Sequence, residues 1–106
     1  MFGLLKRPKL NVININDIDD LIGKINLIDI REPYEYKSGS LKTAKNIPMS
    51  KLLNDHENYL QMGKKYYIYC LSGARSMRAV AYLSKLGYDL VNVSGGIGSY
   101  VGTNRK

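Results

Sequence analysis

The sequence predicts an α/β fold with a mostly parallel sheet and helices on both of its faces. Short apolar runs alternate along the chain with amphipathic stretches of helical length, the pattern that produces β-α-β units. The clearest strand pattern ends at residue 69 and is followed, after a tight loop, by the clearest helical pattern. No internal repeat or linker interrupts the chain, so residues 1–106 are expected to form a single domain.

The first half of the chain holds short elements. Residues 10–15 predict the first strand, and Asn16 is expected to cap a helix whose first turn is acidic. The apolar face of this helix has helical spacing and consists of Ile18, Leu21, Ile22 and Ile25. Residues 26–30 predict the second strand, and Pro33 suits the first turn of a helix that runs to about Ser38. The remaining short elements are a minimal strand at 44–47, a helical turn at 51–53 capped by Ser50, and another turn at 57–62.

The second half carries the stronger patterns. Residues 66–69 are aromatic and β-branched, which favours a strand. The helix expected at 76–86 has an apolar face formed by Ala79, Val80, Leu83 and Leu86, and Gly87 is placed to end it. Residues 90–93 predict the last strand, followed by a Gly95-Gly96 turn and a short helix at about 97–101. Sites in parallel sheets form beyond the carboxyl ends of the strands, and Cys70 lies at such a position.

Composition and charge narrow the classes of function. The net charge of +7 comes from dispersed basic residues without a nucleic-acid-binding motif, so we expect no nucleic-acid partner. No stretch approaches the about 18 apolar residues that span a membrane, and we expect no membrane partner. The lone Cys70 excludes an internal disulfide, a C-x-x-C redox pair and a cysteine-rich metal site. A free thiol suits a reducing compartment, so we expect a cytoplasmic protein with no metal and no cofactor.

The loop after the clearest strand contains the residues that we expect to be reactive. Its sequence is Cys70-Leu71-Ser72-Gly73-Ala74-Arg75-Ser76. A tight turn from a strand into a helix directs successive backbone N–H groups into one concavity, and the helix start adds its positive dipole end. Gly73 permits backbone angles that a side chain would forbid, and Arg75 supplies a permanent positive charge. We expect this loop to stabilise the reactive thiolate of Cys70 and to bind an anionic group beside it.

This loop resembles the C-x-x-G-x-R-S signature of the rhodanese-like family. Three further segments are similar to that family's elements in the same order: residues 27–36 to D-x-R-x-x-x-E-[FY], residues 39–48 to G-H-I-x-G-A-x-N-I-P, and residues 87–96 to G-[FY]-x-x-V-x-x-x-x-G-G. The match covers about residues 11–101, which we take as the core of the domain. Ser40 stands where the family usually has His, Thr43 where it has Gly, and Tyr100 where it often has Trp. These departures fall on positions that look structural in the family.

The resemblance implies a three-layer fold with a five-stranded sheet, and sulfurtransferase activity. In the family's mechanism, Cys70 takes the outer sulfur of thiosulfate or of a persulfide-bearing protein and carries it as a persulfide until a thiol acceptor removes it. The substrate-binding loop would consist of Leu71, Ser72, Gly73, Ala74, Arg75 and Ser76, with backbone amides holding the persulfide. Asp29, Arg31 and Glu35 are interpreted as an ion-pair cluster that supports the site.

Several alternatives remain open. Cysteine phosphatases and arsenate reductases use a C-x5-R loop, whereas four residues separate Cys70 from Arg75, and a shorter loop suits one sulfur atom better than a phosphate. A non-catalytic interaction module is a second possibility. A relay that receives sulfur from a partner protein is a third, which the sequence does not separate from a thiosulfate sulfurtransferase. A Cys-His pair would need the single histidine, His56, close to Cys70, but its polar neighbours predict a solvated surface residue.

Overall fold

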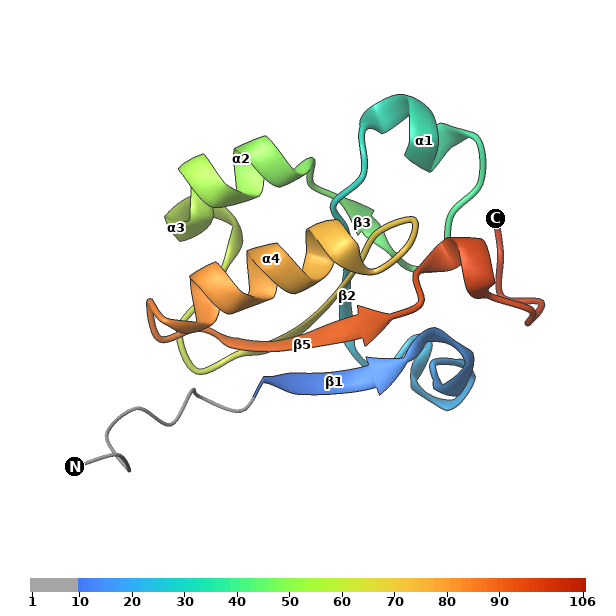
Figure 1. The fold of residues 1–106 in the computed structure, drawn as a ribbon, viewed down its shortest axis with the longest axis horizontal. Coiled ribbons are helices and arrows are strands. Elements are labelled where there is room, and N and C mark those ends of the chain that lie inside the picture. Colours follow the sequence, from blue (N-terminus) through green and yellow to red (C-terminus); the bar gives the residue numbers. More distant parts are fainter. Residues whose placement is uncertain (1–9) are drawn as a thin grey trace.

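A single parallel sheet organises the protein (Figure 1), as described by a computed structural model of residues 10–106. Its strands are β1 (Asn11–Asn14), β2 (Asn26–Asp29), β3 (Lys45–Asn46), β4 (Lys65–Tyr69) and β5 (Asp89–Ser94), in the spatial order β1-β5-β4-β2-β3. Every neighbouring pair is parallel, which confirms the predicted α/β class. All five carboxyl ends therefore meet at one edge of the sheet.

Helices cover both faces of this sheet. The α-helices are α1 (Pro33–Lys37), α2 (Met49–Asn54), α3 (His56–Tyr59) and α4 (Ala74–Ser84), and the 3₁₀ helices are η2 (Ile15–Asp17), η3 (Asp19–Leu21) and η4 (Ile97–Ser99). Figure 1 shows α2, α3 and α4 together on one side of the sheet, with η2, η3 and η4 near the other. Successive strand side chains point to opposite faces, so Ile68 and Cys70 pack on the α4 side while Tyr69 packs on the other.

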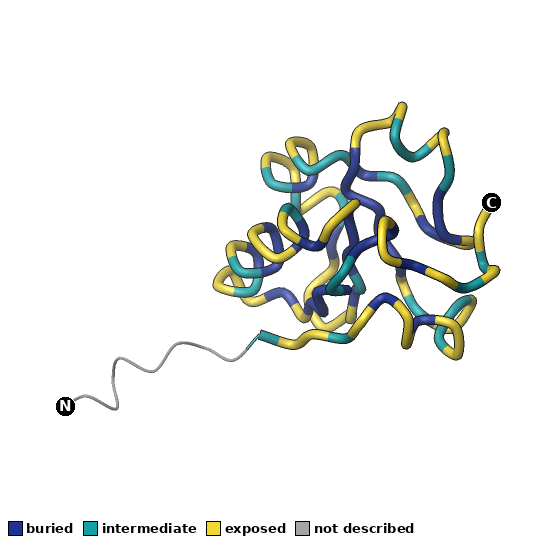
Figure 2. Tube along the Cα trace, turned by 45° about the vertical axis from the view of Figure 1, so that its right-hand side comes forward, coloured by how far each residue is buried: buried dark blue, intermediate teal, exposed yellow. Residues whose placement is uncertain are grey.

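The sheet divides the core into two apolar clusters, and the buried residues lie in the interior of the molecule (Figure 2). The cluster under α4 consists of Ile28, Ile30, Ile47, Leu52, Leu60, Tyr66, Ile68, Cys70, Ala79, Val80, Leu83, Tyr88 and Leu90. The opposite cluster consists of Ile15, Ile18, Leu27, Leu41, Ala44, Tyr69, Val93, Ile97 and Tyr100. The three central strands, β2, β4 and β5, are buried on both faces, which explains why they are mostly apolar, whereas the edge strand β1 is largely exposed.

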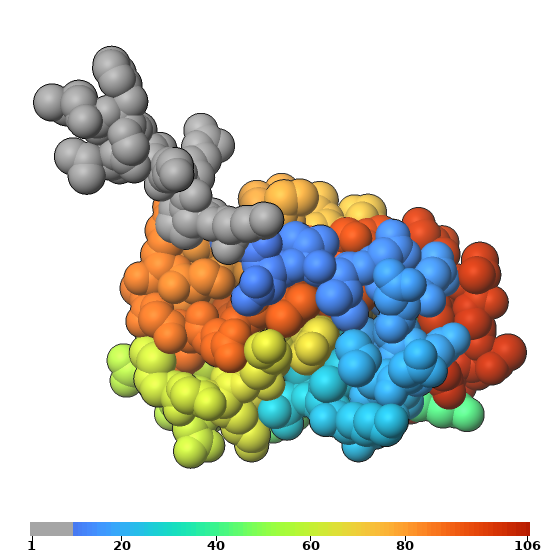
Figure 3. Space-filling model, turned by 90° about the horizontal axis from the view of Figure 1, so that it is seen from below, coloured from blue at the N-terminus to red at the C-terminus, as the bar shows by residue number. Residues whose placement is uncertain are grey.

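The helix predicted from Asn16 is wrong. Two 3₁₀ helices occupy this stretch, and the cap is Asn14, whose side chain accepts a hydrogen bond from the Asn16 amide at 2.9 Å. The Asn16 side chain is used instead in tertiary contacts, donating to the Ser99 carbonyl at 3.1 Å and accepting from the Val101 amide at 3.0 Å. Figure 3 shows the resulting contact between this N-terminal stretch (blue) and the C-terminal residues (red).

The boundaries of two other helices also differ from the prediction. Helix α4 begins at Ala74, two residues earlier than predicted, because Gly73 adopts a left-handed conformation (φ 98°) and turns the chain directly into the helix. It ends at Ser84, so Leu86 lies beyond it and is exposed instead of completing the apolar face. Helix α2 begins at Met49, so Ser50 lies inside it and is not its cap.

Within residues 10–106, none of the helices has the length and apolar character that crossing a membrane requires.

Candidate active site

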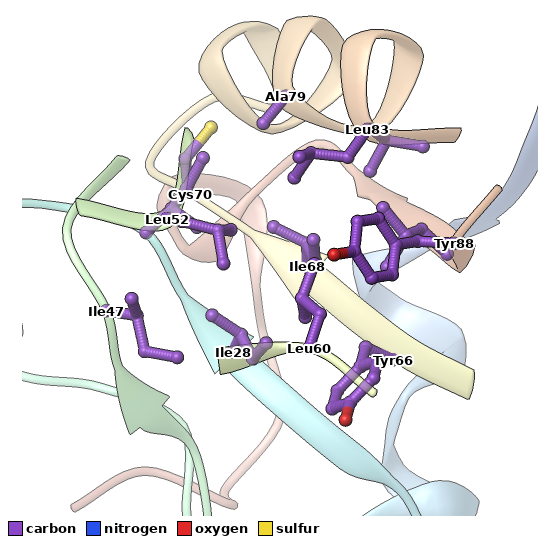
Figure 4. Packing of buried hydrophobic residues seen from close by; sticks show 13 residues of the cluster. Ile28, Ile47, Leu52, Leu60, Tyr66, Ile68, Cys70, Ala79, Leu83 and Tyr88 are labelled. Atoms are coloured by element: carbon purple, nitrogen blue, oxygen red, sulfur yellow. The ribbon is translucent and has the colours of Figure 1, made fainter. Parts of the chain in front are cut away.

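Cys70 directly follows β4 and is fully buried (Figure 4). Its sulfur accepts hydrogen bonds from the backbone amides of Gly73 at 3.1 Å and Ser76 at 3.4 Å. The thiol also lies 3.5 Å from the Ser76 hydroxyl, which itself donates to the Gly73 carbonyl at 3.1 Å. The loop and the first turn of α4 thus converge on a single sulfur atom, at the positive end of the helix dipole.

These contacts favour the thiolate of Cys70. Burial by itself raises the pKa of the thiol, since it penalises the charged form. The hydrogen bond with the Ser76 hydroxyl and the hydrogen bonds from the amides of Ser76, Gly73 and Ser72 act in the opposite direction and outweigh burial, so the pKa of Cys70 is lowered from its ordinary value. All the groups that lower this pKa belong to the loop and to the first turn of α4, and the thiolate is the reactive form of cysteine.

The loop is held in place by the turn after β5. The Cys70 carbonyl accepts from the Ile97 amide, and the Leu71 carbonyl accepts from the Gly98 amide, both at 2.9 Å. Gly96 lies so close to this loop that an added Cβ would overlap the Leu71 carbonyl and approach the Cys70 oxygen to 2.6 Å. The double glycine of the sequence therefore serves a close backbone approach that positions the Cys70 loop.

The guanidinium of Arg75 binds the carboxylate of Glu35. Its two terminal nitrogens reach the two carboxylate oxygens of Glu35 at 2.9 and 3.1 Å, which ties α4 to α1. Hydrogen bonding to Arg75 lowers the pKa of Glu35 to about 2. The pair neutralises the cation that the sequence places in the loop.

Asp29 and Arg31 form a second, separate pair at the end of β2. Both residues are buried, and the Asp29 carboxylate accepts from the Arg31 amide at 2.9 Å and from its guanidinium at 2.8–3.1 Å. Arg31 also donates to the Gly39 carbonyl at 2.7 Å. The three residues predicted as one cluster are therefore divided between two ion pairs, each of which joins loops at the carboxyl edge of the sheet.

Three other loop residues lie at the protein surface. Leu71, Ser72 and Ala74 are exposed, and the Ala74 amide lies 3.5 Å from the Ser72 hydroxyl. In residues 10–106, no three His, Cys, Asp or Glu side chains gather where they could hold a metal ion.

His56 does not lie beside Cys70. Its Nδ1 is 2.7 Å from the hydroxyl of Tyr88, with the rings edge to face at 5.4 Å. Tyr88 precedes β5 whereas Cys70 follows β4, and the two strands are parallel, so the two sites lie at opposite edges of the sheet. Figure 4 shows Cys70 and Tyr88 at different ends of the cluster under α4. The prediction of a solvated histidine is wrong, because His56 is partly buried and hydrogen-bonded.

A comparison with known protein families decides the classification. Residues 14–103 match the model of the rhodanese-like domain, which is most of the chain. The chain belongs to the rhodanese-like family. The resemblance seen in the four sequence motifs is thereby confirmed.

Proteins with similar sequences carry names that describe different functions. The chain is 39% identical to the uncharacterized protein YqhL of Bacillus subtilis over 74% of its length, and spans 63% of that protein. It is 39% identical to a sulfurtransferase of Allochromatium vinosum, over 76% of this chain and 72% of that protein. A tRNA uridine(34) hydroxylase of Bartonella quintana is 36% identical over 76% of this chain, which spans only 29% of that enzyme.

Solved structures share the rhodanese-like fold over nearly the whole chain. SSP1007 of Staphylococcus saprophyticus superimposes with a TM-score of 0.82 at 30% identity, covering 92% of this chain and 99% of that one. A rhodanese-related protein of Thermoplasma volcanium gives a TM-score of 0.75 at 38% identity, covering 86% and 95%. The three-layer fold with a five-stranded sheet is therefore confirmed.

The sequence analysis did not identify the residues after β5 whose backbone amides bind the Cys70 loop. The amides of Ile97 and Gly98 donate to the carbonyls of Cys70 and Leu71. Backbone hydrogen bonds of this kind do not require particular side chains, so the sequence does not reveal them. The only signal was the Gly95-Gly96 pair, which the sequence analysis took as a turn and not as a contact surface. The partner of Arg75 was also missed, although Glu35 had been identified as a supporting residue.

Proposed function

We propose that this protein is a sulfurtransferase that carries a sulfane sulfur as a persulfide on Cys70. The observation that carries the proposal is the set of donors aimed at Cys70 Sγ from Gly73 and Ser76, at the start of α4. These donors favour the thiolate of Cys70, which is the form that attacks a sulfur donor and that leaves when the sulfur is passed on. Membership of the rhodanese-like family, which includes proteins named as sulfurtransferases, supports the same activity.

The transfer needs no redox partner. The Cys70 thiolate attacks the outer sulfur of thiosulfate, an S–S bond forms to Cys70, and the S–S bond of thiosulfate breaks with its electron pair leaving on sulfite. With a persulfide donor, the leaving group is the donor's thiolate. A thiol acceptor then attacks the outer sulfur as its thiolate, and Cys70 leaves as the thiolate that began the cycle.

The substrate-binding role falls to the loop from Leu71 to Ser76. In the described chain, residues 10–106, the amides of Leu71 and Arg75 have no hydrogen-bond acceptor within the protein, so both are available to the outer sulfur. The Asp29–Arg31 and Glu35–Arg75 pairs act as supports, because each is closed on itself and neither touches the sulfur. A buried free thiol of this kind suits the reducing cytoplasm, which we propose as its location.

Two alternatives are less well supported. A cysteine phosphatase needs its arginine free to bind the phosphate, whereas Arg75 is bound by Glu35. A purely structural interaction module gives no reason for two backbone amides and a hydroxyl to contact one buried sulfur. We propose neither nucleic acid nor a membrane as a partner.

Intact mass spectrometry tests the proposal directly. Wild-type protein incubated with thiosulfate, or with glutathione persulfide, is expected to gain the mass of one sulfur atom, and a reducing agent should remove it. Cys70→Ser is expected to show no gain, with an unchanged circular dichroism spectrum as the control for folding. A gain retained in Cys70→Ser would contradict the mechanism, and failure of every donor to load wild type would favour an interaction module.

A further inference from the structure

A pocket of about 290 Å³ lies beside the amino-terminal ends of β2, β3 and β4. Its lining comes from these strand starts, from the segments that directly precede them, and from Tyr59 at the end of α3. The strands are parallel and Cys70 follows the carboxyl end of β4, so this pocket and the Cys70 sulfur lie at opposite edges of the sheet. The proposed sulfur transfer makes no use of it.

The buried residues that line this pocket are apolar or aromatic. Ile28 on β2, Ile47 after β3 and Tyr66 on β4 all belong to the cluster under α4, and Figure 4 shows Ile28 between the other two. Tyr59 packs against the same cluster. Because the core fixes these side chains, the pocket offers a preformed surface to an apolar group, and its volume suits a small ligand.

The rest of the lining is rich in hydrogen-bond donors. Lys45 on β3 and Lys64 directly before β4 contribute two positive charges from separate segments. The Tyr66 hydroxyl accepts a hydrogen bond from the Gln61 amide at 2.9 Å, and no acceptor for its own proton is present among residues 10–106. Thr43 contributes a second hydroxyl-bearing side chain. These groups favour a ligand that carries several acceptor oxygens.

The charge around this pocket is positive. Within residues 10–106 the salt bridges belong to Arg31 and Arg75, so Lys45 and Lys64 are not paired with carboxylates there, and residues 1–9 contain no acidic residue. No Asp or Glu lines the pocket, and Glu57 on α3 lines a different one. Two lysines without carboxylate partners, on a chain with a net charge of +7, attract an anion.

We propose that this pocket binds a small phosphate monoester, with its phosphate between Lys45 and Lys64 and its apolar group over Tyr66. A phosphate monoester carries a charge of about −1.5 to −2 at neutral pH and has three strong acceptor oxygens, which matches two cations and two hydroxyls. A carboxylate has a single charge and two oxygens, so it would leave some of these donors unused.

The backbone of Thr43 supports the same assignment. Its φ of 71° is the one positive value at a residue other than glycine among residues 10–106. Strained backbone of this kind persists where the surrounding structure fixes it, and it is concentrated at ligand sites. Glycine would relieve the strain at this position but would remove the side chain that lines the pocket. Contact with a ligand is a physical reason to keep it.

NMR titration of the ¹⁵N-labelled protein with three probes tests the site. Phenyl phosphate has both the phosphate and the ring, inorganic phosphate lacks the ring, and benzoate keeps the ring but carries one negative charge. Phenyl phosphate is expected to bind about tenfold more tightly than either of the others. The amide shifts should centre on Thr43, Lys45 and Lys64, and added salt should weaken binding.

Variants of the lining separate ligand contact from stability. Lys45→Gln and Lys64→Gln are each expected to weaken phenyl phosphate binding about fivefold. Lys85→Gln is the matched control, because Lys85 is an exposed lysine at the end of α4 and outside the pocket. Thr43→Gly should weaken binding about threefold even though it relieves strain, while Thr43→Ser keeps a hydroxyl and should retain the affinity.

Four results would overturn this inference. They are the absence of binding by every probe, equal affinities for the three probes, lysine variants that bind like the Lys85→Gln control, and amide shifts centred on residues 70–76. The last of these would place the anion at the Cys70 loop. Since none of the four measures the loading of sulfur onto Cys70, the proposed function is tested separately.

Discussion

The carboxylate of Glu35 on α1 is held by both terminal nitrogens of Arg75 on α4, with Nη1–Oε1 at 2.9 Å and Nη2–Oε2 at 3.1 Å. The two residues lie 40 positions apart in the chain. Their side chains are only 16% and 32% exposed, so the bidentate pair is partly shielded from water. It ties the start of α4, which follows the Cys70 loop, to α1.

Breaking this pair is expected to cost stability and slow sulfur transfer. Glu35→Gln should lower the free energy of unfolding by about 1–2 kcal/mol, since a shielded bidentate pair is worth more than an exposed one. A double-mutant cycle with Arg75→Ala, measured by urea unfolding, should give a positive coupling energy. Glu57→Gln, at an exposed site on α3, is the control. Strictly additive effects of the two changes would show that the contact contributes nothing.

The same pair predicts how stability depends on acid pH. The pKa of Glu35 is lowered to about 2 in the folded protein, from an ordinary value of 4.5. A depressed carboxyl pKa contributes stability that is fully present above pH 4.5 and is lost as the pH falls towards about 2. Urea midpoints measured across this window should fall more steeply for wild type than for Glu35→Gln. Parallel curves for the two proteins would contradict the assignment.

Ser76 is expected to tune the thiol. Ser76→Ala removes the hydroxyl that lies 3.5 Å from Cys70 Sγ and keeps the backbone donor, so the pKa of Cys70 should rise. The pH dependence of alkylation by iodoacetamide reports this pKa. Ser72→Ala removes a hydroxyl that contacts the Ala74 amide and should shift the profile less. A profile that Ser76→Ala leaves unmoved would mean that the amides alone set the reactivity.

Thr43 is strained where the family usually has glycine. Its φ is 71°, and it is the one residue other than glycine with positive φ among residues 10–106. A left-handed conformation costs a residue with a β-carbon about 1–2 kcal/mol. Glycine avoids this cost but loses about 0.5–1 kcal/mol of stability, because its unfolded state has more conformational freedom. Thr43→Gly should therefore stabilise the protein by about 0.5–1 kcal/mol in urea unfolding. Thr43→Ala keeps a β-carbon and should stabilise much less, and an equal gain in both would exclude backbone strain as the cause.

Gly96 is expected to tolerate no side chain. An added Cβ would meet the Leu71 carbonyl and the Cys70 oxygen, so Gly96→Ala should displace the loop and lower stability by about 2 kcal/mol or more. Gly23→Ala is the matched control, because Gly23 also has positive φ but nothing lies within 4 Å of its Cβ position. The thermal midpoints of the two variants should differ clearly. Similar losses would mean that φ alone matters at Gly96.

The sequence by itself determined the sheet, the Cys70 loop and the family. Strands that are buried on both faces leave mostly apolar runs in the sequence. These runs predicted both ends of β2, β4 and β5 to within one residue. The loop was equally readable, since its function depends on local order: a strand end, Cys70, Gly73 and a helix start follow one another within a few residues.

Tertiary structure decided the features that join distant segments. Asn16 was expected to cap a helix, but its side chain binds Ser99 and Val101, and the local helical spacing is overridden. The pairing of Arg75 with Glu35, and the approach of Gly96 to the Cys70 loop, depend on segments brought together only when the sheet assembles. Periodicity and motif spacing report on neighbours within one element, whereas these contacts are selected by the packing of elements against one another, which no local pattern encodes.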